Sequence, residues 1–466
     1  MQKNKIDLTQ TQLFIDDTWI EDSVRIQRVF HQPKKMPHPI LAPDRSYEEG
    51  CVAYGTILLR NNRFHLWYIT WSRNSRLKVC YAVSEDGLNF TKPDLGIYEF
   101  EGSKKNNICL MLAETASIDN ISVIEDTDDA DWPLKAVFYQ HVPGRKELNG
   151  LTVCRSKDGI YWEQNPGLVL PGYGDRTNAA ATKINGKFVV LTRTPKNPYD
   201  CRMVWRLESE DLIHWSKPEL ILRPDIEDDS SLEIYSSTAF KYESLYLGFI
   251  ERMHMRPDKL DSELIYSQDS YIWKRTWRRD SFIPWGLSGT FDNVWVSMPS
   301  NGPIDFKNNL WFYYSGRSAA HHVPYPLNYG AIGVSVLRRD GFASLFNTHG
   351  EGWLVTPPIR WPDKDLLINA DPRRDLTSHP HCGHCQGSVQ VEVRDAENRP
   401  LSGYGQNDCL PIRNTMDCFM SRAPVLWRKS KSMRKAAGQM VRLVFYLQDA
   451  HLYSFAAGDK NSKTQV

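Results

Sequence analysis

The chain has 466 residues, of which 41% are hydrophobic and 24% charged, a composition that excludes a mainly disordered protein. Its 57 Lys and Arg residues nearly balance its 56 Asp and Glu residues, so the net charge of +1 gives no general attraction to nucleic acid or to an anionic membrane. We therefore expect neither of these as a partner, and the length allows two or three domains.

The start of the chain lacks the apolar core of a secretory signal, and no later run approaches the roughly 18 apolar residues of a membrane span. As written, the sequence predicts a cytoplasmic protein, whereas a periplasmic or secreted one would follow if a leader had been removed. The nine cysteines are odd in number, and those at positions 51, 80, 109, 154 and 201 stand singly within or beside apolar runs. This pattern favours reduced, buried thiols.

Short apolar or alternating runs, separated by Asn, Gly, Asp and Pro, recur along the chain and predict β-strands. Clear examples are residues 55–59, 64–68, 187–191, 245–249 and 310–314. Several follow a turn such as Arg60-Asn-Asn-Arg, which indicates repeated β-hairpins. Helical periodicity is scarce and aromatic residues make up 12% of the chain, so the predicted fold class is all-β.

A second repeat, Ser-x-Asp-x-x-x-aromatic, occurs downstream of the hairpins. Its four clear copies begin 53 to 72 residues apart, at Ser84, Ser156, Ser209 and Ser267, and a degenerate fifth copy ends at Phe342. This spacing fits four-stranded propeller blades with insertions, so we predict a five-bladed β-propeller. The aspartates of the repeat are expected to cap turns rather than to act in catalysis.

The blade repeat divides the chain into three regions. Residues 1–43 are expected to form an N-terminal strand segment that packs on the propeller or on the domain after it, and residues 44–348 to form the catalytic propeller. In residues 349–466 the strands alternate without the blade repeat, for example at 387–400, which predicts a C-terminal β-sandwich.

This arrangement resembles the five-bladed propeller glycoside hydrolases of families 43 and 32. Besides the aromatic-rich blades and the trailing sandwich, the resemblance rests on the segments Ser209-Glu-Asp-Leu-Ile-His-Trp-Ser-Lys-Pro and Gly333-Val-Ser-Val-Leu-Arg-Arg-Asp-Gly-Phe-Ala-Ser. With the segments Leu13-Phe-Ile-Asp-Asp, His31-Gln-Pro-Lys-Lys and Asp449-Ala-His-Leu-Tyr-Ser-Phe, the whole chain is similar to an uncharacterised, family-32-like branch of bacterial proteins. The Asp-Pro expected in the first blade is absent, and Tyr54 and Gly55 stand there. The resemblance implies a glycosidase with three acids on three blades, whose roles it leaves open.

Glycoside hydrolysis needs one carboxyl group that protonates the leaving oxygen and one that activates water or attacks the sugar. In a propeller such groups come from the first strand of a blade. Glu49, Asp175 and Glu233 stand 12 to 15 residues before the second strands of their hairpins, at registers that agree within a few positions. We predict that these three acids are catalytic, although each could equally cap a turn or pair with a neighbouring base.

The surroundings of the three acids suggest different roles. Apolar neighbours of Glu233 would raise its pKa and suit a general acid. Arg176 would keep the adjacent Asp175 ionised, in an orienting role. By elimination Glu49 would be the base or nucleophile, with two nearby acids, Glu48 and Asp44, as competitors. Residues expected to bind sugar hydroxyl or carboxylate groups in the same funnel are Asp119, Arg176, Arg193, Arg252, Asp292, Arg317, His321 and His322.

One cluster has the composition of a metal site. Its members could supply a tetrahedral structural site, closed locally or with Cys409 or Cys418, and the alternative is a polar loop on the sandwich. The cluster consists of His379, His381, Cys382, His384 and Cys385. Since no phosphate-binding loop, serine-hydrolase elbow or metalloprotease motif is present in the sequence, we predict no cofactor.

The leading hypothesis is a glycoside hydrolase that cleaves an oligosaccharide in the central funnel of the propeller, with a furanoside-type sugar favoured. One alternative is an exo-sialidase-like hydrolase, for which Tyr235 beside Glu233 could serve as the nucleophile. Another is a carbohydrate-binding propeller without catalysis. An oligosaccharide is the partner that the sequence predicts, and the oligomeric state stays open.

Overall fold

The computed structural model describes residues 6–70, 77–112, 116–194, 201–321, 323, 327–347, 350–372, 387–413, 422–429 and 432–459. These residues form β-strands joined by loops and short 3-10 turns, which confirms the all-β prediction. Within the described ranges, no helix has the length and apolar character required to cross a bilayer. The chain divides into two compact units: Pro33–Ile304 with Trp311–Val336, and Met1–Gln32 with Asp305–Leu310 and Leu337–Val466.

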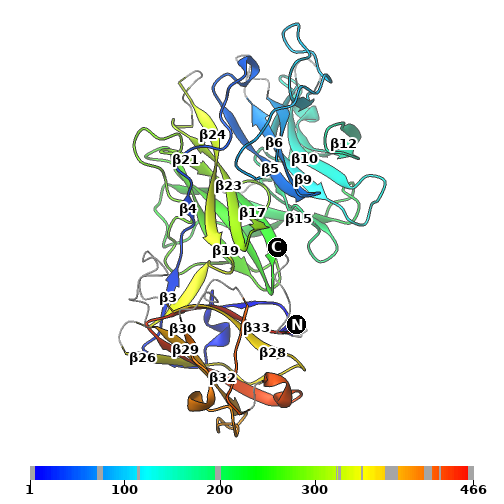
Figure 1. The fold of residues 1–466 in the computed structure, drawn as a ribbon. Helices are drawn as coiled ribbons and strands as arrows, with labels where there is room; N and C mark the ends of the chain where they lie inside the picture. Colours follow the sequence, from blue (N-terminus) through cyan, green and yellow to red (C-terminus); the bar gives the residue numbers. More distant parts are fainter. Residues whose placement is uncertain are drawn as a thin grey trace. The chain divides into compact units, whose positions relative to one another are not determined.

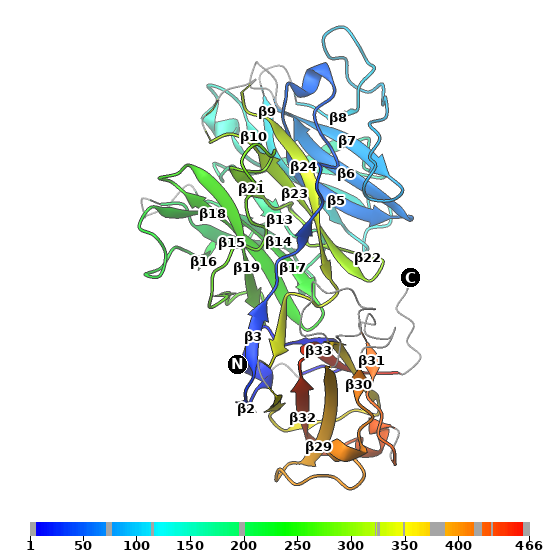
Figure 2. The same ribbon diagram turned by 60° about the vertical axis from the view of Figure 1, so that its left-hand side comes forward.

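The larger unit begins with three antiparallel sheets of four strands, each a meander in chain order (Figures 1 and 2). The first contains β5 (Val52–Arg60), β6 (Arg63–Thr70), β7 (Lys78–Ser84) and β8 (Ile108–Leu110). The second contains β9 (Ser117–Glu125), β10 (Leu134–His141), β11 (Gly150–Ser156) and β12 (Glu163–Pro171). The third contains β13 (Asn178–Ala179), β14 (Phe188–Thr192), β15 (Val204–Ser209) and β16 (Glu219–Leu222).

The segments expected to be the fourth and fifth blades share one sheet of nine strands. A parallel contact of Leu260 with Trp295 joins β19 to β21 and so connects the two segments. Whether the sheets close into five blades stays a prediction. The strands are β17 (Leu232–Tyr242), β18 (Leu245–His254), β19 (Lys259–Ser267), β20 (Lys274–Arg275), β21 (Trp295–Ser297), β22 (Ile304–Phe306), β23 (Asn309–Arg317), β24 (Gly330–Arg338) and β4 (Lys34–Lys35).

The Ser-x-Asp repeats form turns of one design. In the first, Ser84 Oγ donates to Asp86 Oδ1 at 2.9 Å, and the same oxygen accepts the backbone N–H groups of Leu88 and Asn89 at 2.9 and 2.8 Å. These donors hold the pKa of Asp86 well below its usual range. The copies that begin at Ser156, Ser209 and Ser267 make the same set of bonds. The aspartates therefore cap turns, as predicted.

The aromatic residue that ends each repeat also has a structural role. The indole N–H of Trp162, Trp215 and Trp273 donates to the backbone carbonyl of the residue three positions earlier, at 3.0 to 3.2 Å. In the first repeat, where Phe90 ends the copy, the hydroxyl of Tyr313 donates to the Gly87 carbonyl instead, at 3.0 Å. These bonds satisfy carbonyls of the tight turns.

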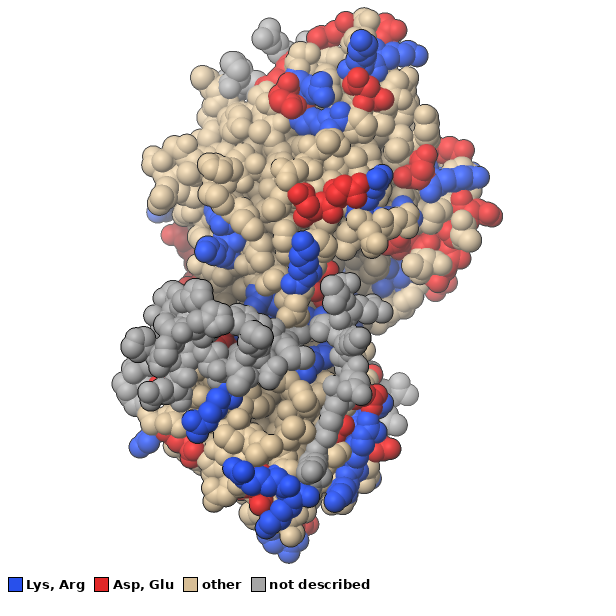
Figure 3. Space-filling model, viewed as in Figure 1, with Lys and Arg blue, Asp and Glu red and all other residues tan. Residues whose placement is uncertain are grey.

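The cysteines of the described residues lie outside disulfides, and of these only Cys201 is partly exposed. Burial raises the pKa of Cys154 to about 12, which makes it unreactive at neutral pH. The predicted burial is thus confirmed for Cys51, Cys80, Cys109 and Cys154, whereas Cys201 is only partly buried. On the face shown in Figure 3, acidic and basic side chains lie interspersed, in keeping with the balanced charge.

The smaller unit contains two sheets of six strands, and side chains of both enter one hydrophobic cluster. Phe14, Phe445 and Phe455 are part of this cluster, with ring centroids 5.7 to 6.1 Å apart. The N-terminal strands β1 (Gln12–Leu13), β2 (Asp22–Val24) and β3 (Gln27–Phe30) pair within these sheets. The remaining strands are β25 (Ala343–Phe346), β26 (Glu351–Val355), β27 (Ile359–Arg360), β28 (Asp365–Asp371), β29 (Ser388–Asp395), β30 (Ile412–Arg413), β31 (Ala423–Pro424), β32 (Met440–Gln448) and β33 (His451–Gly458).

Candidate functional site

The first strands of the sheets in the larger unit, β5, β9, β13 and β17, contact one another in chain order. At or beside three of them a residue other than glycine has a left-handed backbone: Tyr54 (φ 45°), Asn120 (φ 59°) and Arg176 (φ 56°). The ladders of β5 and β9 shift register at Tyr54 and Asn120, as that of β17 does at Tyr235. Such bulges redirect side chains, and they place a polar cluster among the first strands.

Two carboxyl groups from different sheets form the chemical centre of this cluster. Asp119, in β9, is partly exposed but closely surrounded by protein. Burial and the nearby Asp175 together raise its pKa to about 6, against the opposing effect of Arg176 and Arg193. Asp175, just before β13, pairs with Nη1 of Arg193 at 2.9 Å. The site thus holds one carboxyl that can keep a proton near neutral pH beside one that is paired with a cation.

A wall of aromatic and basic side chains adjoins the acid pair. Arg193 Nη2 donates to the carbonyl of Tyr235 at 2.9 Å, and its guanidinium lies 4.6 Å from the centroid of that ring. The Tyr235 hydroxyl bonds with Nε2 of His321 at 3.2 Å, and both rings contact Trp295 at centroid distances of 5.3 Å. Arg317 lies 4.8 Å above the Trp295 ring. The contacts with Tyr235 join β17 to the segments that carry Asp175 and His321.

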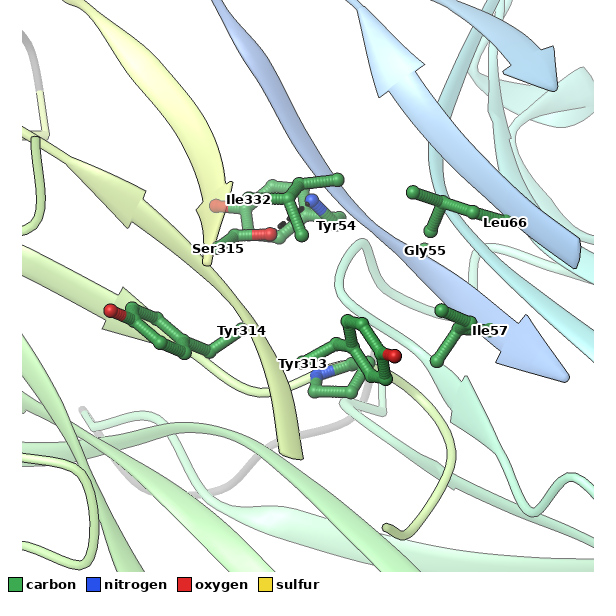
Figure 4. A pocket seen from close by; sticks show the side chains of 9 residues that line it. Tyr54, Gly55, Ile57, Leu66, Tyr313, Tyr314, Ser315 and Ile332 are labelled. Carbon is green, nitrogen blue, oxygen red and sulfur yellow. Dashed lines mark hydrogen bonds between the residues drawn. The ribbon is translucent and has the colours of Figure 1, made fainter. Parts of the chain in front are cut away.

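Tyr54 closes the cluster on the side of β5. Its ring lies 3.8 Å from the guanidinium of Arg176, and its backbone N–H donates to Oγ of Ser315 at 2.7 Å, the bond drawn in Figure 4. The small cavity of Figure 4 lies beside this bond. Because no charged side chain lines it, we regard the cavity as a packing gap rather than as a reaction site. Its lining residues are Tyr54, Gly55, Ile57, Leu66, Pro299, Tyr313, Tyr314, Ser315 and Ile332.

The structure brings together six of the predicted site residues, which are Asp119, Asp175, Arg176, Arg193, Arg317 and His321. One of their expected contacts is different. The partner of Asp175 is Arg193 rather than the adjacent Arg176, because the left-handed backbone turns Arg176 into the interior.

Glu233 stands in β17, two residues before Tyr235, and its carboxylate forms an ion pair with Arg202. The apolar surroundings expected for Glu233 are therefore not found. The sequence could not reveal this pair, since Arg202 lies 31 residues earlier, in the loop before β15.

Glu49 lies in the turn between η2 (Ser46–Glu48) and β5, where its backbone is left-handed with φ 42°. Its Oε2 atom is buried and has no hydrogen-bond partner. Of its two competitors, Glu48 is fully buried and paired with Lys92 at 2.8 Å, and Asp44 is exposed and paired with the same lysine at 2.6 Å. Lys92 and Glu48 thus form a structural pair.

Two further predicted binding residues have structural partners. Arg252 is buried and pairs with Asp261 at 2.7 Å and Glu263 at 3.3 Å. Asp292 is buried and pairs with Lys35 at 2.6 Å. His322 and the histidine–cysteine cluster of residues 379–385, predicted as a binding residue and a metal site, lie outside the described residues.

The sequence predicts Asp119 as a substrate-binding residue and does not identify it as the acid. A signal was present, since Asp119 stands 15 residues before Leu134, the start of β10, as Glu49 stands 15 before Phe64. Between β9 and β10 a long loop from Asp126 to Pro133 replaces the tight hairpin turn, so this register could not be counted back from a turn motif. Glu251 was missed because it lies in a second strand, in the apolar run Leu245-Tyr-Leu-Gly-Phe-Ile-Glu.

Comparison with protein-family models gave no match. Among curated proteins, the chain is 24% identical over 212 residues to a 1,2-beta-oligomannan phosphorylase of Thermoanaerobacter sp. (strain X514). The aligned part is 43% of this chain and spans 62% of that relative's length.

Several solved structures of carbohydrate-active enzymes are similar to this chain. A glycosyl hydrolase from Bacteroides ovatus is 14% identical, with a TM-score of 0.47 and coverage of 66% of this chain and 94% of that one. The beta-1,2-mannobiose phosphorylase from Listeria innocua is 15% identical, with a TM-score of 0.48 and coverage of 68% and 97%. The alpha-L-arabinofuranosidase PaAbf62A from Podospora anserina is 12% identical, with a TM-score of 0.46 and coverage of 66% and 97%.

Proposed function

We propose that the chain is a carbohydrate-active enzyme that cleaves a glycosidic bond of an oligosaccharide at the acid pair Asp119 and Asp175. The observation that carries this proposal is the convergence of two carboxyl groups from two sheets, one of them with a pKa raised to about 6. Glycosidic cleavage needs a carboxyl group that can donate a proton to the departing oxygen, and a neighbouring negative charge helps such a group keep its proton. The proposal includes the finer architecture expected from the sequence, a five-bladed propeller followed by a β-sandwich.

In this proposal Asp119 protonates the oxygen of the departing sugar. A general acid works best when its pKa lies near the working pH, and the value of about 6 meets this condition better than an ordinary aspartate. Asp175, held by Arg193, would orient the sugar hydroxyls and maintain the negative charge that keeps Asp119 protonated. Glu233 is the less suitable acid because its carboxylate is engaged by Arg202.

The group that attacks the sugar can be water or inorganic phosphate. If water attacks, the chain is the glycoside hydrolase expected from the sequence, with a furanoside as the favoured substrate. If phosphate attacks, the chain is a phosphorylase, an assignment supported by the name of the curated relative. Glu49 remains a candidate base for water, since its Oε2 atom is buried and lacks a hydrogen-bond partner, whereas attack by phosphate requires no such base.

The test is a substrate panel measured with and without inorganic phosphate. It contains β-1,2-linked manno-oligosaccharides, aryl furanosides, aryl pyranosides and sialosides, and chromatography separates free sugars from sugar 1-phosphates. We expect cleavage of one class by the wild type and a loss of at least about 100-fold in Asp119→Asn. Asp128→Asn is the matched control, because Asp128 follows the same strand and is 72% exposed.

Three outcomes would change the assignment. Full activity of Asp119→Asn together with loss in Glu233→Gln would restore Glu233 as the acid. Binding of a sugar by calorimetry without turnover of the panel would favour the carbohydrate-binding alternative. The sialidase alternative needs Tyr235 activated by Glu233, but the Tyr235 hydroxyl bonds with His321, and only cleavage of a sialoside would revive it.

A further inference from the structure

A second charged pair lies in the interior of the larger unit. Glu251, in β18, is fully buried, and its Oε1 accepts hydrogen bonds from Arg176, from Ser297 Oγ and from the backbone N–H of Met298, the last at 3.1 Å. The Arg176 side chain is 2% exposed. Since a buried charge is costly without its partner, neither residue is explained by packing alone.

Arg176 connects the two segments that carry the acids. Its Nη1 donates to Oδ1 of Asn120 at 2.8 Å. Asn120 directly follows Asp119 in the chain, just as Arg176 directly follows Asp175. Both Asn120 and Arg176 have left-handed backbones, a conformation that residues other than glycine keep only where their surroundings hold them. The Asn120–Arg176 bond therefore holds the backbone of both segments and so orients the side chains of the preceding residues, Asp119 and Asp175.

We propose that Glu251 is a positioning residue for the acid pair. It holds the Arg176 side chain in place and balances its positive charge. Arg176 can then keep Asp119 beside Asp175 without its own charge favouring the ionised form of Asp119. The inference rests on the proposed function, because it concerns the same site.

The groups around Asp119 show how this balance works. Asp175 raises the pKa of Asp119, whereas Arg176 and Arg193 lower it. On the neighbouring strands β10 and β17, the negative charge of Asp119 contributes to raising the pKa values of Tyr139 and Tyr235. Glu251 is the buried anion that contacts Arg176. Without it the positive charge of Arg176 would be unbalanced, and Asp119 would lose its proton at a lower pH.

The test is a direct titration of Asp119 in the full chain, by infrared or ¹³C NMR spectroscopy of protein with ¹³C-labelled aspartate, with Asp119→Asn to assign the signal. We expect Glu251→Gln, which keeps a hydrogen-bond acceptor but removes the charge, to lower the midpoint by about one pH unit or more. Glu251→Asp, which keeps the charge, should leave the midpoint near that of the wild type. Ser297→Ala is the control for charge, because it removes one hydrogen bond to Glu251 and one from Arg176 without any change of charge.

A second variant tests the clamp if Glu251→Gln does not fold. Asn120→Gly tolerates the left-handed backbone and removes the bond from Arg176, together with the bonds that Asn120 Nδ2 donates to the Thr177 carbonyl and to Asn178 Oδ1. We expect its Asp119 midpoint to fall, and the further change Asp175→Asn to have little effect, because the two acids are no longer held together. An unchanged midpoint in Asn120→Gly, or equal midpoints in the wild type and a folded Glu251→Gln, would overturn the inference.

The readout separates this inference from the proposed function. The titration needs no substrate, so the expected shift can be observed even if no sugar is cleaved, which would count against the proposed function alone. Conversely, if cleavage depends on Asp119 but the titration midpoint of Asp119 is the same with and without the Glu251 charge, the proposed function stands and the positioning role is refuted.

Discussion

Replacing Asp119 with asparagine should make the protein more stable at neutral pH. The folded chain raises the pKa of Asp119 from 3.8 to about 6, so the folded state binds this proton more tightly than the unfolded state does. Stability is therefore lost as the pH rises from about 4 to about 6, and asparagine, which carries no charge, avoids this loss. The variant should gain nothing at pH 4.

The size of the effect follows from the two pKa values. One pKa unit corresponds to about 1.4 kcal/mol, so the full interval is worth about 3 kcal/mol. Because Asp119 is partly exposed, solvent screening reduces the gain to roughly 1 to 3 kcal/mol. The same substitution should abolish cleavage, which would make Asp119 a residue that lowers stability for the sake of its chemistry.

The assay is differential scanning calorimetry of the wild type and Asp119→Asn at pH 4, 5, 6 and 7. The difference between the melting temperatures should grow with pH and level off above pH 6. Asp128→Asn, altered at an exposed site, should show no such trend. A variant that is less stable than the wild type at pH 7 would refute the reasoning, since it would mean that Arg176 and Arg193 stabilise an ionised Asp119.

Three further predictions concern the framework. Lys92→Met leaves Glu48 buried without its cation and should lower the free energy of unfolding by about 3 to 5 kcal/mol, measured by calorimetry. Adding Glu48→Gln in the same chain should restore part of this loss, and no recovery would argue against the pair. Trp67→Phe removes a 2.6 Å hydrogen bond from a fully buried indole to the Gly159 carbonyl and should lower the free energy of unfolding by about 1 to 3 kcal/mol. An unchanged melting temperature would contradict a structural role for this bond. Asp211→Ala, which deprives two backbone N–H groups of their acceptor at an exposed turn, should cost only about 1 kcal/mol and should not alter sugar cleavage.

Structure formed by residues near one another in the chain was predictable. In the repeat that begins at Ser84, the bonds made by the Ser84 and Asp86 side chains join residues at most three positions apart, so the local sequence specifies the turn. The hairpin between β5 and β6 follows likewise from the alternating runs and the Asn-Asn turn between them.

The composition of the site was only partly predictable. Asp119, Asp175 and Arg176 could be listed, because polar residues stand out at the start of an apolar strand. Their roles could not be predicted, since the role of a carboxyl group depends on the nearest charge, and that charge comes from a distant part of the chain. Glu233 faces Arg202 and Arg176 faces Glu251, across 31 and 75 residues of chain.

By itself, then, the sequence determined the all-β class, the repeated turns and the buried thiols, all of which depend on local hydrogen bonds or on hydrophobicity. Only the tertiary structure decided which acid can hold a proton, because the pKa of Asp119 is set by burial and by Asp175, 56 positions further along the chain. It likewise decided that the N-terminal strands β1, β2 and β3 pair within the sheets of the smaller unit. Strand pairing between distant segments is chosen by which edges and apolar faces meet in the folded chain, and a pattern of single residues does not record that choice.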